Sequence, residues 1–331
     1  MTPTFQALVV RVSDEKNYTR AIEERSIDDL PQGEVLIRVH YSSLNYKDGL
    51  SCIGNRGVTR HYPHTPGIDA AGVVETSESN DFKAGDPVVI TCYDLGMNTA
   101  GGFSQFIRVP ADWVMPLPDG LSLRESMIYG SAGFTAGLSV DVLQRQGVNP
   151  EKGPIVVTGA TGGVGSVSVA LLAGRGYSVS ASTGKPDAED FLKKLGASEV
   201  IGRDAVNDKY GKPLLKETWA NAIDTVGGTT LATLLKACKE GGAVAATGMV
   251  ASTDLPTTVF PFILRGVSLL GINAQGTSMS IRQKIWSKLA KEWKPAGFER
   301  LAFDCRLEKL NPEIDRILAG GQRGRVVVNL Q

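Results

Sequence analysis

A glycine-rich segment near the middle of the chain constrains the possible folds more than any other feature. Residues 156–165 read ValValThrGlyAlaThrGlyGlyValGly, at the junction of an apolar strand predicted at Ile155–Thr158 and a helix predicted at Gly163–Arg175. The spacing Ala160-x-Gly162-x-x-Gly165 is a variant of the dinucleotide-binding fingerprint. Gly162 lets the backbone approach a pyrophosphate, and Gly165 lets the helix pack close to the strand. The residues expected to contact the phosphates are Ala160, Thr161, Gly162, Gly163, Val164 and Gly165.

Strand and helix patterns continue to alternate after this segment. Further short strands are predicted at Tyr177–Ser182, Glu199–Ile201, Asn221–Asp224, Ala243–Thr247 and Val267–Ile272. Helices are predicted at Asp187–Leu195, Thr230–Cys238 and Arg282–Lys294. This alternation predicts a doubly wound parallel sheet covered by helices on both faces, the architecture in which the fingerprint binds a dinucleotide.

The end of the second strand favours NADP over NAD. It reads AlaSerThrGlyLys at 181–185, where an NAD site usually places an acidic residue for the ribose hydroxyls. Hydroxyl and cationic side chains suit a 2′-phosphate, which a carboxylate would repel. The residues expected at this phosphate are Ser182, Thr183, Gly184, Lys185 and Arg203. The alternative is that Lys185 and Arg203 are solvated surface charges.

The first part of the chain has a different pattern. Strands are predicted at Phe5–Arg11, Glu34–Tyr41, Ala71–Glu75 and Pro87–Thr91, and the alternation with helices begins only near Leu123. The tail, Arg325–Leu330, reads as a strand that can return to the N-terminal part. A chain of 331 residues exceeds one ordinary hydrophobic core, so we expect two domains.

Composition and charge exclude several classes of protein. Lys plus Arg equals Asp plus Glu at 35 each, so the chain offers no broad surface for nucleic acid or an anionic membrane. No stretch approaches the ~20 apolar residues of a membrane span, and the N-terminus lacks the pattern of a signal peptide. The four cysteines (Cys52, Cys92, Cys238 and Cys305) are too widely spaced for a zinc site and too few for a disulfide scaffold. We therefore expect a cytoplasmic protein that acts on a small molecule.

Four further segments carry a resemblance to a known family. They read SerSerLeuAsnTyrLysAspGly at 42–49, ProGlyIleAspAlaAlaGlyVal at 66–73, TyrGlySerAlaGlyPheThrAla at 129–136 and ProPheIleLeuArgGlyValSerLeuLeuGlyIle at 261–272. With the fingerprint and the GlyArgValValVal tail, the chain resembles the quinone-oxidoreductase branch of the medium-chain dehydrogenase/reductases. Within that branch it is similar to the zinc-independent YhdH/YhfP-type group of quinone oxidoreductases and acrylyl-CoA reductases. The resemblance spans essentially the whole chain.

The resemblance implies an α/β fold with two domains. A GroES-like β-rich catalytic domain is expected over 1–125 and 295–331, and a Rossmann domain with a doubly wound parallel sheet over 126–294, with nicotinamide and substrate bound between them. Zinc-dependent relatives carry Cys at the position matching Asn45 and Gly-His-Glu at the positions matching 67–69. Both are replaced here, so no metal is expected. His61 and His64 are expected to be loop histidines rather than a metal-binding pair.

The resemblance also places the chemistry on the loop that follows the strand predicted at Glu34–Tyr41. Asn45 is expected to hold the nicotinamide or the oxygen on which negative charge develops, and Tyr46 to contact the cofactor or donate a proton. Asp48 is a candidate catalytic residue or an anchor of the loop. Turn chemistry is the alternative for all three. The general acid stays open among Tyr46, Tyr93 and a bound water, because Leu50–Val58 lacks the tyrosine that some enoyl reductases use there.

Further contacts follow from the same resemblance. The residues implied near the nicotinamide end of the cofactor or around it are Thr135, Gly248, Met249, Ile263, Asn273 and Arg325. Met249 and Ile263 would equally suit a hydrophobic core. A CoA substrate would also need cations for its phosphates, and Lys47, Arg56 and Arg60 are candidates by their closeness in sequence to Asn45.

Three functions are compatible with these features. The first is an NADPH-dependent reductase of α,β-unsaturated acyl-CoA, with acrylyl-CoA as the leading substrate. The second is a quinone or enone reductase. The third is a crystallin-like or RNA-binding role, which the neutral charge and the complete cofactor motif argue against.

Val267–Ile272 is expected to be an apolar edge strand that pairs two copies into a homodimer.

Overall fold

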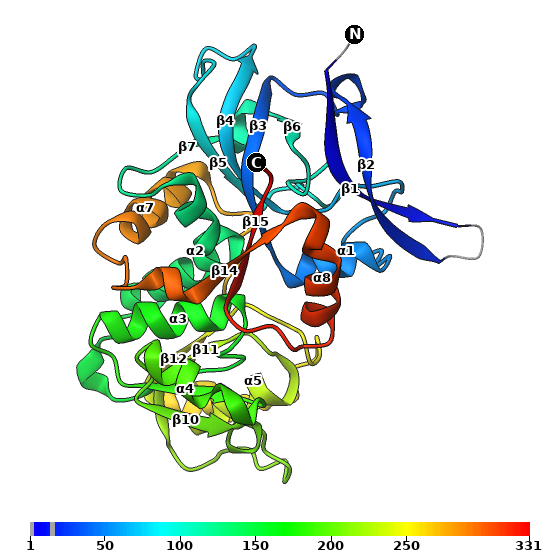
Figure 1. The fold of residues 1–331 in the computed structure, drawn as a ribbon. Helices are drawn as coiled ribbons and strands as arrows, with labels where there is room; N and C mark the ends of the chain where they lie inside the picture. The colour runs from blue at the N-terminus through cyan, green and yellow to red at the C-terminus, as the bar shows by residue number, and fades with distance from the viewer. Residues whose placement is uncertain (1–2, 14–16) are drawn as a thin grey trace. The chain divides into compact units, whose positions relative to one another are not determined.

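The computed structural model describes residues 3–13 and 17–331, and it divides into two compact units (Figure 1). Unit 1 comprises Met1–Ser131, Gln275–Ala290 and Glu299–Gln331, and unit 2 comprises Ala132–Ala274 and Lys291–Phe298. This division departs from the predicted domain boundaries mainly by grouping residues 275–290 with unit 1. The Arg282 guanidinium supplies the reason, because it donates to the Thr91 carbonyl at 3.0 Å and lies 4.2 Å from the centre of the Tyr93 ring. The predicted boundaries themselves stay a prediction.

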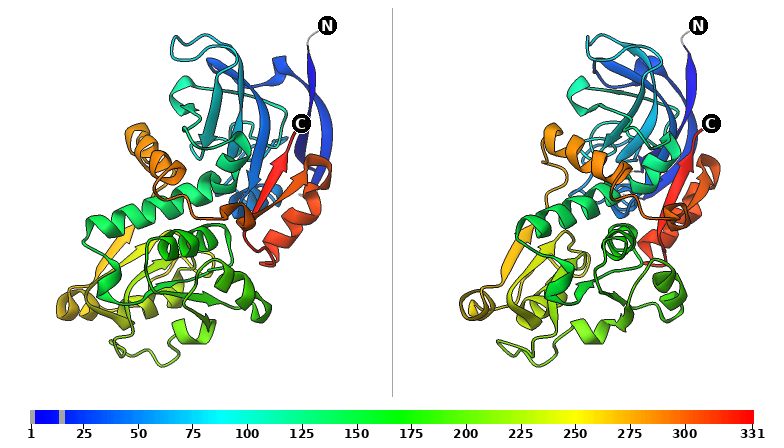
Figure 2. Two further views of the ribbon diagram at one scale, coloured as in Figure 1. Left: turned by 60° about the vertical axis from the view of Figure 1, so that its left-hand side comes forward. Right: turned by 90° about the vertical axis from the view of Figure 1, so that its left-hand side faces the viewer.

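Unit 1 is built mainly from strands. Its strands are β1 (Thr4–Val12), β2 (Tyr18–Ser26), β3 (Val35–Leu44), β4 (Asp69–Ser77), β5 (Pro87–Thr91), β6 (Phe106–Val109), β7 (Met115–Pro116), β14 (Ala302–Arg306) and β15 (Arg325–Asn329). Its helices are α1 (Tyr46–Cys52), α7 (Met279–Ala290) and α8 (Leu310–Leu318). The long helix α2 (Leu123–Arg145), visible in both views of Figure 2, has residues 123–131 in unit 1 and residues 132–145 in unit 2, and a non-helical backbone conformation at Gly130 interrupts it.

The main sheet of unit 1 has the order β14-β15-β3-β4-β5-β7, and β6 also pairs with β3. β15 runs antiparallel to β3, with Val327 opposite Ser43. The prediction that the tail returns to the N-terminal part is therefore confirmed. Alternating apolar residues of these strands, such as Ile37 and Val326, form one core, in which each fully buried aliphatic side chain contributes about 1.5–3 kcal/mol.

Unit 2 contains the alternating strands and helices. Its strands are β8 (Ile155–Val157), β9 (Val179–Thr183), β10 (Glu199–Gly202), β11 (Trp219–Asp224), β12 (Cys238–Ala246) and β13 (Ser268–Gly271). Its helices are α3 (Gly163–Gly174), α4 (Glu189–Lys194), α5 (Gly228–Ala237) and α6 (Phe260–Arg265). The strands form one parallel sheet in the order β10-β9-β8-β11-β12-β13. The predicted parallel sheet is confirmed.

This strand order identifies where a ligand binds. β8 leads through α3 to β9 on one side, and β11 lies on its other side, so the direction of winding reverses between β8 and β11. Open α/β sheets bind their ligands at the carboxyl ends of the strands at such a reversal. The carboxyl end of β8 is the start of the glycine-rich segment, as the sequence predicted.

Among the described residues, no helix has both the length and the apolar character that crossing a membrane requires.

Candidate active site

The fingerprint loop has the tight geometry that its glycines permit. Gly159 has a φ of +55°, and a Cβ there would meet the Thr225 hydroxyl. A Cβ on Gly165 would lie 2.2 Å from the carbonyl oxygen of Gly159, so α3 approaches β8 only because residue 165 is glycine. The loop is fastened to β9 by the N–H of Ala160, which donates to the carbonyl of Ser182 at 3.0 Å. Gly159, which the sequence analysis did not single out, therefore makes the sharp turn.

The carboxyl ends of β8 and β11 are locked together beneath this loop. Buried Asp224 accepts a hydrogen bond from the Thr158 hydroxyl at 2.6 Å and another from the N–H of Gly227 at 2.8 Å. The Thr225 hydroxyl donates in turn to the Thr158 carbonyl at 2.9 Å. Burial raises the pKa of Asp224, against the lowering by its hydrogen-bond donors. This network fixes the edge of the sheet where the strand order reverses.

The end of β9 gathers the residues predicted for a 2′-phosphate. The Lys185 ammonium donates to the Thr161 hydroxyl at 3.1 Å, which links the end of β9 to the fingerprint loop. Arg203 is exposed, and its guanidinium lies over Gly184, because a Cβ on that glycine would fall 2.2 Å from the Arg203 Nε. The Thr183 hydroxyl accepts a hydrogen bond from the backbone N–H of Lys185 at 3.1 Å. Two cations and two hydroxyls thus meet at one edge of unit 2.

The other predicted cofactor residues of unit 2 lie on loops after its strands and on its helices. Gly248 follows β12, and a Cβ there would lie 2.2 Å from the carbonyl oxygen of Thr225, so this loop runs against the β11 loop. Met249 and Ile263 are 68% and 73% exposed, so neither is a core residue. Asn273 is also exposed, and Thr135 is half-buried in α2, where its carbonyl accepts the Ser139 hydroxyl.

Unit 1 contains a buried polar cluster that sequence analysis located only in part. The cluster comprises Ser43, Asn45, Asp69, Ser131 and Arg325, which come from β3, the start of α1, β4, α2 and β15. Asp69 lies at its centre and accepts hydrogen bonds from the hydroxyls of Ser43 at 2.6 Å and Ser131 at 2.5 Å and from the Asn45 amide at 2.7 Å. A buried carboxylate with so many donors is held in one orientation.

Asn45 is tied into this cluster through its whole amide. Its Nδ2 donates to Asp69 at 2.7 Å and to the Ser43 carbonyl at 3.1 Å, and its Oδ1 accepts from Arg325 at 3.1 Å. An amide nitrogen carries two hydrogens, and both have protein acceptors here. Asn45 therefore fixes the start of α1, and the predicted donation from Asn45 to a substrate oxygen has no free hydrogen in this geometry.

Asp48 anchors the same loop. Its carboxylate accepts from the backbone N–H of Asn45 at 2.8 Å and of Ile68 at 2.9 Å, and its side chain is fully buried. Burial, followed by the charge of Asp69, raises the pKa of Asp48 to about 7, although these hydrogen bonds favour the ionised form. The anchoring role predicted for Asp48 agrees with these contacts.

The placement of Arg325 argues against its predicted contact with the cofactor. Its guanidinium is only 2% exposed and donates to the carbonyls of Ile128 and Leu44, to Asn45 and to the Ser43 hydroxyl at 2.7–3.2 Å. It also forms a 3.8 Å ion pair with Asp69. The β15 register carries Arg325 to the end of β3, so its side chain points into the polar cluster. Burial lowers the pKa of Arg325, and the two nearby carboxylates oppose that shift.

Tyr46 and Tyr93, the two tyrosines predicted as candidate proton donors, both lie in unit 1. Tyr46 is the first residue of α1 and is 38% exposed. The Tyr93 ring stacks on the Trp113 ring, and the two ring centres are 5.4 Å apart. The Arg282 guanidinium lies 4.2 Å from the centre of the Tyr93 ring. Cys92 and Tyr93 have φ values of +64° and +52°, a conformation that non-glycine residues rarely adopt and that often occurs at functional sites. Burial raises the pKa of Tyr93.

The residues at the former zinc-ligand positions do not fit a zinc ion. Zinc needs thiolate, imidazole or carboxylate ligands that are free to coordinate it. Asn45 and Ile68 stand where zinc-dependent relatives carry Cys and His, and neither offers such a ligand, while the Asn45 amide is bonded to Asp69 and Arg325. Within residues 3–13 and 17–331, no group of three or more His, Cys, Asp or Glu side chains could hold a metal ion. His61 is exposed and His64 is buried, with its backbone paired to Val10.

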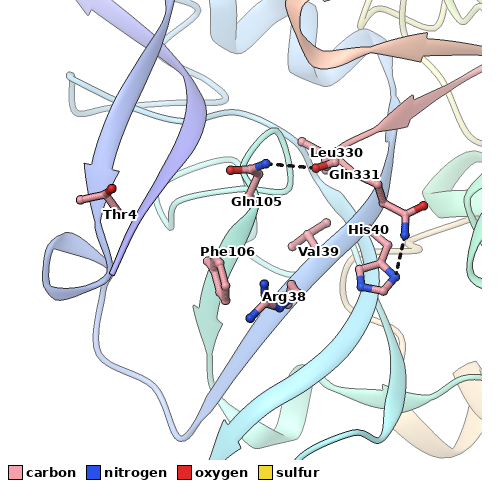
Figure 3. Close-up of a pocket in the computed structure, with 8 residues that line it drawn as sticks. All are labelled: Thr4, Arg38, Val39, His40, Gln105, Phe106, Leu330 and Gln331. Carbon is pink, nitrogen blue, oxygen red and sulfur yellow. Dashed lines mark hydrogen bonds between the residues drawn. The ribbon is translucent and has the colours of Figure 1, made fainter. Parts of the chain in front are cut away.

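A hollow in unit 1 has a volume of about 360 Å³ (Figure 3). Its lining residues are Thr4, Arg38, Val39, His40, Gln105, Phe106, Leu330 and Gln331. None of the residues predicted for the cofactor or for catalysis lies among them.

Comparison with known proteins defines the class of this molecule. Residues 31–119 match the family model of the alcohol dehydrogenase GroES-like domain, and residues 163–291 match that of zinc-binding dehydrogenases. The two models occur in the order that the strand-rich unit 1 and the parallel sheet of unit 2 require. Together they describe the medium-chain dehydrogenase/reductase class.

Three proteins narrow the class. One is YhfP of Bacillus subtilis (strain 168), which is named as a quinone oxidoreductase. It is 46% identical to this chain over 331 residues, and the match covers 100% of both chains. Its solved structure with NAD bound has a TM-score of 0.96 at 45% identity and covers 99% of this chain and 100% of that chain. The acrylyl-CoA reductase AcuI of Ruegeria pomeroyi is 46% identical over 328 residues, covering 98% of this chain and 99% of its own.

The third protein is the yhdH oxidoreductase of Salmonella enterica, solved in complex with NADP. It has a TM-score of 0.95 at 41% identity, and the match covers 98% of this chain and 100% of that chain. The chain belongs to the YhdH/YhfP-type group of the medium-chain dehydrogenase/reductases and is an oxidoreductase. The resemblance stated from the sequence is confirmed.

Proposed function

We propose that this enzyme uses NADPH to reduce the activated double bond of an α,β-unsaturated acyl-CoA, with acrylyl-CoA as its substrate. The observation that carries the substrate is the 46% identity to an acrylyl-CoA reductase over 98% of this chain. Tyr46 is the proposed proton donor, and Asn45 and Asp48, which the sequence predicted as catalytic residues, are proposed to position it. The proposed cofactor contacts are those predicted from the sequence, without Arg325.

The choice of NADPH rests on the end of β9. Lys185 and Arg203 offer two cations beside the hydroxyls of Thr161 and Thr183, a set that suits a phosphate dianion. The Salmonella relative was solved with NADP, whereas the B. subtilis relative was solved with NAD. The side chains of this chain, rather than the relatives, therefore support the phosphorylated cofactor.

The chemistry assigns separate roles to the cofactor and to the protein. When bound, NADPH would supply a hydride to the β-carbon of the substrate, negative charge would develop on the thioester oxygen, and a proton from an acid would complete the α-carbon. Asn45 and Asp48 hold the first turn of α1 in place through the buried polar cluster. This fixes the position of Tyr46, which we propose as the proton donor. Tyr46→Phe should lower kcat by about 10²-fold or more, whereas an equal loss in Tyr93→Phe alone would transfer the role to Tyr93.

A quinone is the alternative substrate, because YhfP carries the name of a quinone oxidoreductase. Initial rates of NADPH and NADH oxidation, measured with acrylyl-CoA and with a simple quinone, separate the two functions. We expect the highest kcat/KM for acrylyl-CoA with NADPH. A quinone with the higher kcat/KM and no turnover of acrylyl-CoA would replace the proposal by the alternative.

We further propose that two copies pair through β13. This strand is last in the sheet order, and Leu269 on it is exposed. The neighbouring α6 adds exposed Phe260, Ile263 and Leu264. An open apolar edge favours pairing with an identical edge around a two-fold axis. Light scattering at micromolar concentration should give a dimer that Leu269→Asp dissociates, and a monomeric wild-type protein would contradict the pairing.

Two further expectations belong to the proposal. The enzyme should work without zinc, because Asn45 and Ile68 replace the Cys and His of zinc-dependent relatives and the Asn45 amide is bonded to Asp69 and Arg325. Stoichiometric zinc in the purified protein, with activity lost on chelation, would contradict this. A cytoplasmic location is supported by the four cysteines, all of them buried free thiols.

A further inference from the structure

Three cations beside α1 form a patch that neither the cofactor nor the buried cluster uses. They are Lys47, Arg56 and Arg60, hereafter the basic patch. Lys47 lies in the first turn of α1, and both arginines are exposed on the loop that follows this helix. The patch is therefore continuous with α1, the helix that begins directly after Asn45.

Contacts with one short loop bring the Lys47 side chain and the backbone of Arg60 to neighbouring residues, and the Arg56 side chain reaches the same stretch of backbone. The Lys47 ammonium lies 3.9 Å from the sulfur of Met97 and donates to Gln275 at 3.2 Å. The backbone N–H of Arg60 donates to the side chain of Asn98, the next residue after Met97, at 3.2 Å. The Arg56 guanidinium donates to the carbonyl of Arg60.

The basic patch carries an excess of positive charge. Among the ion pairs of the described residues, none joins Lys47, Arg56 or Arg60 to a carboxylate. The nearby carboxylate of Asp94 is hydrogen-bonded by Asn98 and Thr99 at 3.0 and 3.1 Å. Because none of the three cations has a carboxylate partner among the described residues, the basic patch has a local surplus of positive charge in a chain with formal net charge zero.

We propose that the basic patch binds the phosphate groups of the acyl-CoA substrate, an inference that rests on the function proposed above. CoA carries a diphosphate and a 3′-phosphate, and guanidinium groups bind phosphate oxygens in pairs. The patch adjoins α1, whose first residue is the proposed proton donor. A quinone has no phosphate, so the patch makes the enzyme selective for CoA thioesters over small acceptors.

The test measures the affinity of the full-length enzyme for free CoA by calorimetry, with NADP⁺ present. Arg56→Ala combined with Arg60→Ala should raise the Kd for CoA at least about tenfold. The reason is that a charge-assisted contact typically contributes more binding free energy than a neutral hydrogen bond. The same variant should raise KM for acrylyl-CoA and leave quinone reduction unchanged. Lys47 is left intact because it neighbours the proposed catalytic residues.

Three controls keep the outcome specific to the patch. Arg25→Ala combined with Lys83→Ala removes the same charge outside the patch and should leave the Kd unchanged. Arg56→Lys combined with Arg60→Lys keeps the charge and should retain most of the affinity. Dephospho-CoA, which lacks the 3′-phosphate, should bind more weakly than CoA to the wild-type enzyme. The difference in Kd between the wild type and the double alanine variant should be smaller for dephospho-CoA than for CoA.

The outcomes separate this inference from the function on which it rests. An unchanged Kd in the double alanine variant, or no binding of CoA by the wild type, would overturn the phosphate site even if acrylyl-CoA is reduced. A wild-type enzyme that binds CoA through the patch but turns over only quinones would overturn the proposed function and leave the phosphate site standing.

Discussion

The guanidinium of Arg325 donates a hydrogen bond to the side-chain oxygen of Asn45 at 3.1 Å, across 280 positions of the sequence. Arg325 begins the last strand, and Asn45 precedes the first residue of α1. The same guanidinium faces Asp69, to which Asn45 also donates. A cation from the tail thus balances a buried carboxylate beside Asn45.

Removing Arg325 should destabilise unit 1 strongly. Arg325→Met leaves buried Asp69 without its counter-charge and the Asn45 oxygen without its donor. The expected loss in the free energy of unfolding at neutral pH is about 3–5 kcal/mol. Urea denaturation measures it. Arg316→Ala, which breaks an exposed ion pair with Glu313, is the control and should cost less than about 1 kcal/mol. An Arg325→Met variant as stable as this control would show that the cluster tolerates an unpaired Asp69.

Asn45→Asp should be less stable than Asn45→Ala at neutral pH. The aspartate would bring a second carboxylate to the place from which the Asn45 amide donates to Asp69 at 2.7 Å. The alanine removes the same donor without adding charge. Thermal denaturation of both variants at pH 8 and at pH 5 compares them, and the gap should shrink at pH 5 as the new acid takes up a proton. Equal stability of the two variants at pH 8 would mean that Asn45 does not face Asp69 in solution.

Asp48 should make the protein less stable as the pH rises. Its pKa is about 7 in the folded protein and near its ordinary value of 3.8 in the unfolded chain. Between these values the folded state holds more protons, so the free energy of unfolding falls with increasing pH, by up to ~4 kcal/mol over the whole window. Urea denaturation at pH 5, 6, 7 and 8 gives the slope. Asp48→Asn should flatten it, and the same slope in that variant would assign the titration to another group.

Lys185 and Arg203 should control the choice of cofactor. Lys185→Ala and Arg203→Ala should each raise KM for NADPH by about 10-fold or more, since a hydrogen bond to a charged group contributes about 1.5–3 kcal/mol. KM for NADH should change little, because NADH lacks the 2′-phosphate. Lys193→Ala is the matched control, as Lys193 lies on α4 and donates to the Ser198 carbonyl. A parallel rise in KM for both cofactors would contradict a phosphate-specific contact.

The sequence predicted the parts of the fold that depend on local patterns. Short apolar strands bounded by turns marked all six strands of unit 2, and Pro87–Thr91 has its predicted bounds as β5. Helix α2 was missed because apolar residues lie on all its sides, so no 3.6-residue stripe marks it. Strand β2 was missed because polar residues on both faces hide the period of two.

The candidate site was predictable only where its residues are close in sequence. The fingerprint and the end of β9 are each continuous, so their residues could be named in advance. The buried cluster joins Asn45 to Asp69 and Arg325 through long-range pairing, which no local pattern encodes. Asp69 stands in a segment quoted for the resemblance, and its place among apolar residues of a strand was the one available signal. Gly130 offered none, although a side chain there would collide with the cluster.

The most direct test of this account follows the hydride itself. The enzyme is given acrylyl-CoA and NADPH in which both hydrogens at C4 of the nicotinamide are replaced by deuterium, and mass spectrometry locates the label in the product. The account predicts a saturated acyl-CoA with one deuterium on the β-carbon, and an α-carbon proton that comes from solvent in a parallel reaction in D₂O. Oxidation of NADPH that leaves no deuterium in the acyl-CoA would contradict the account.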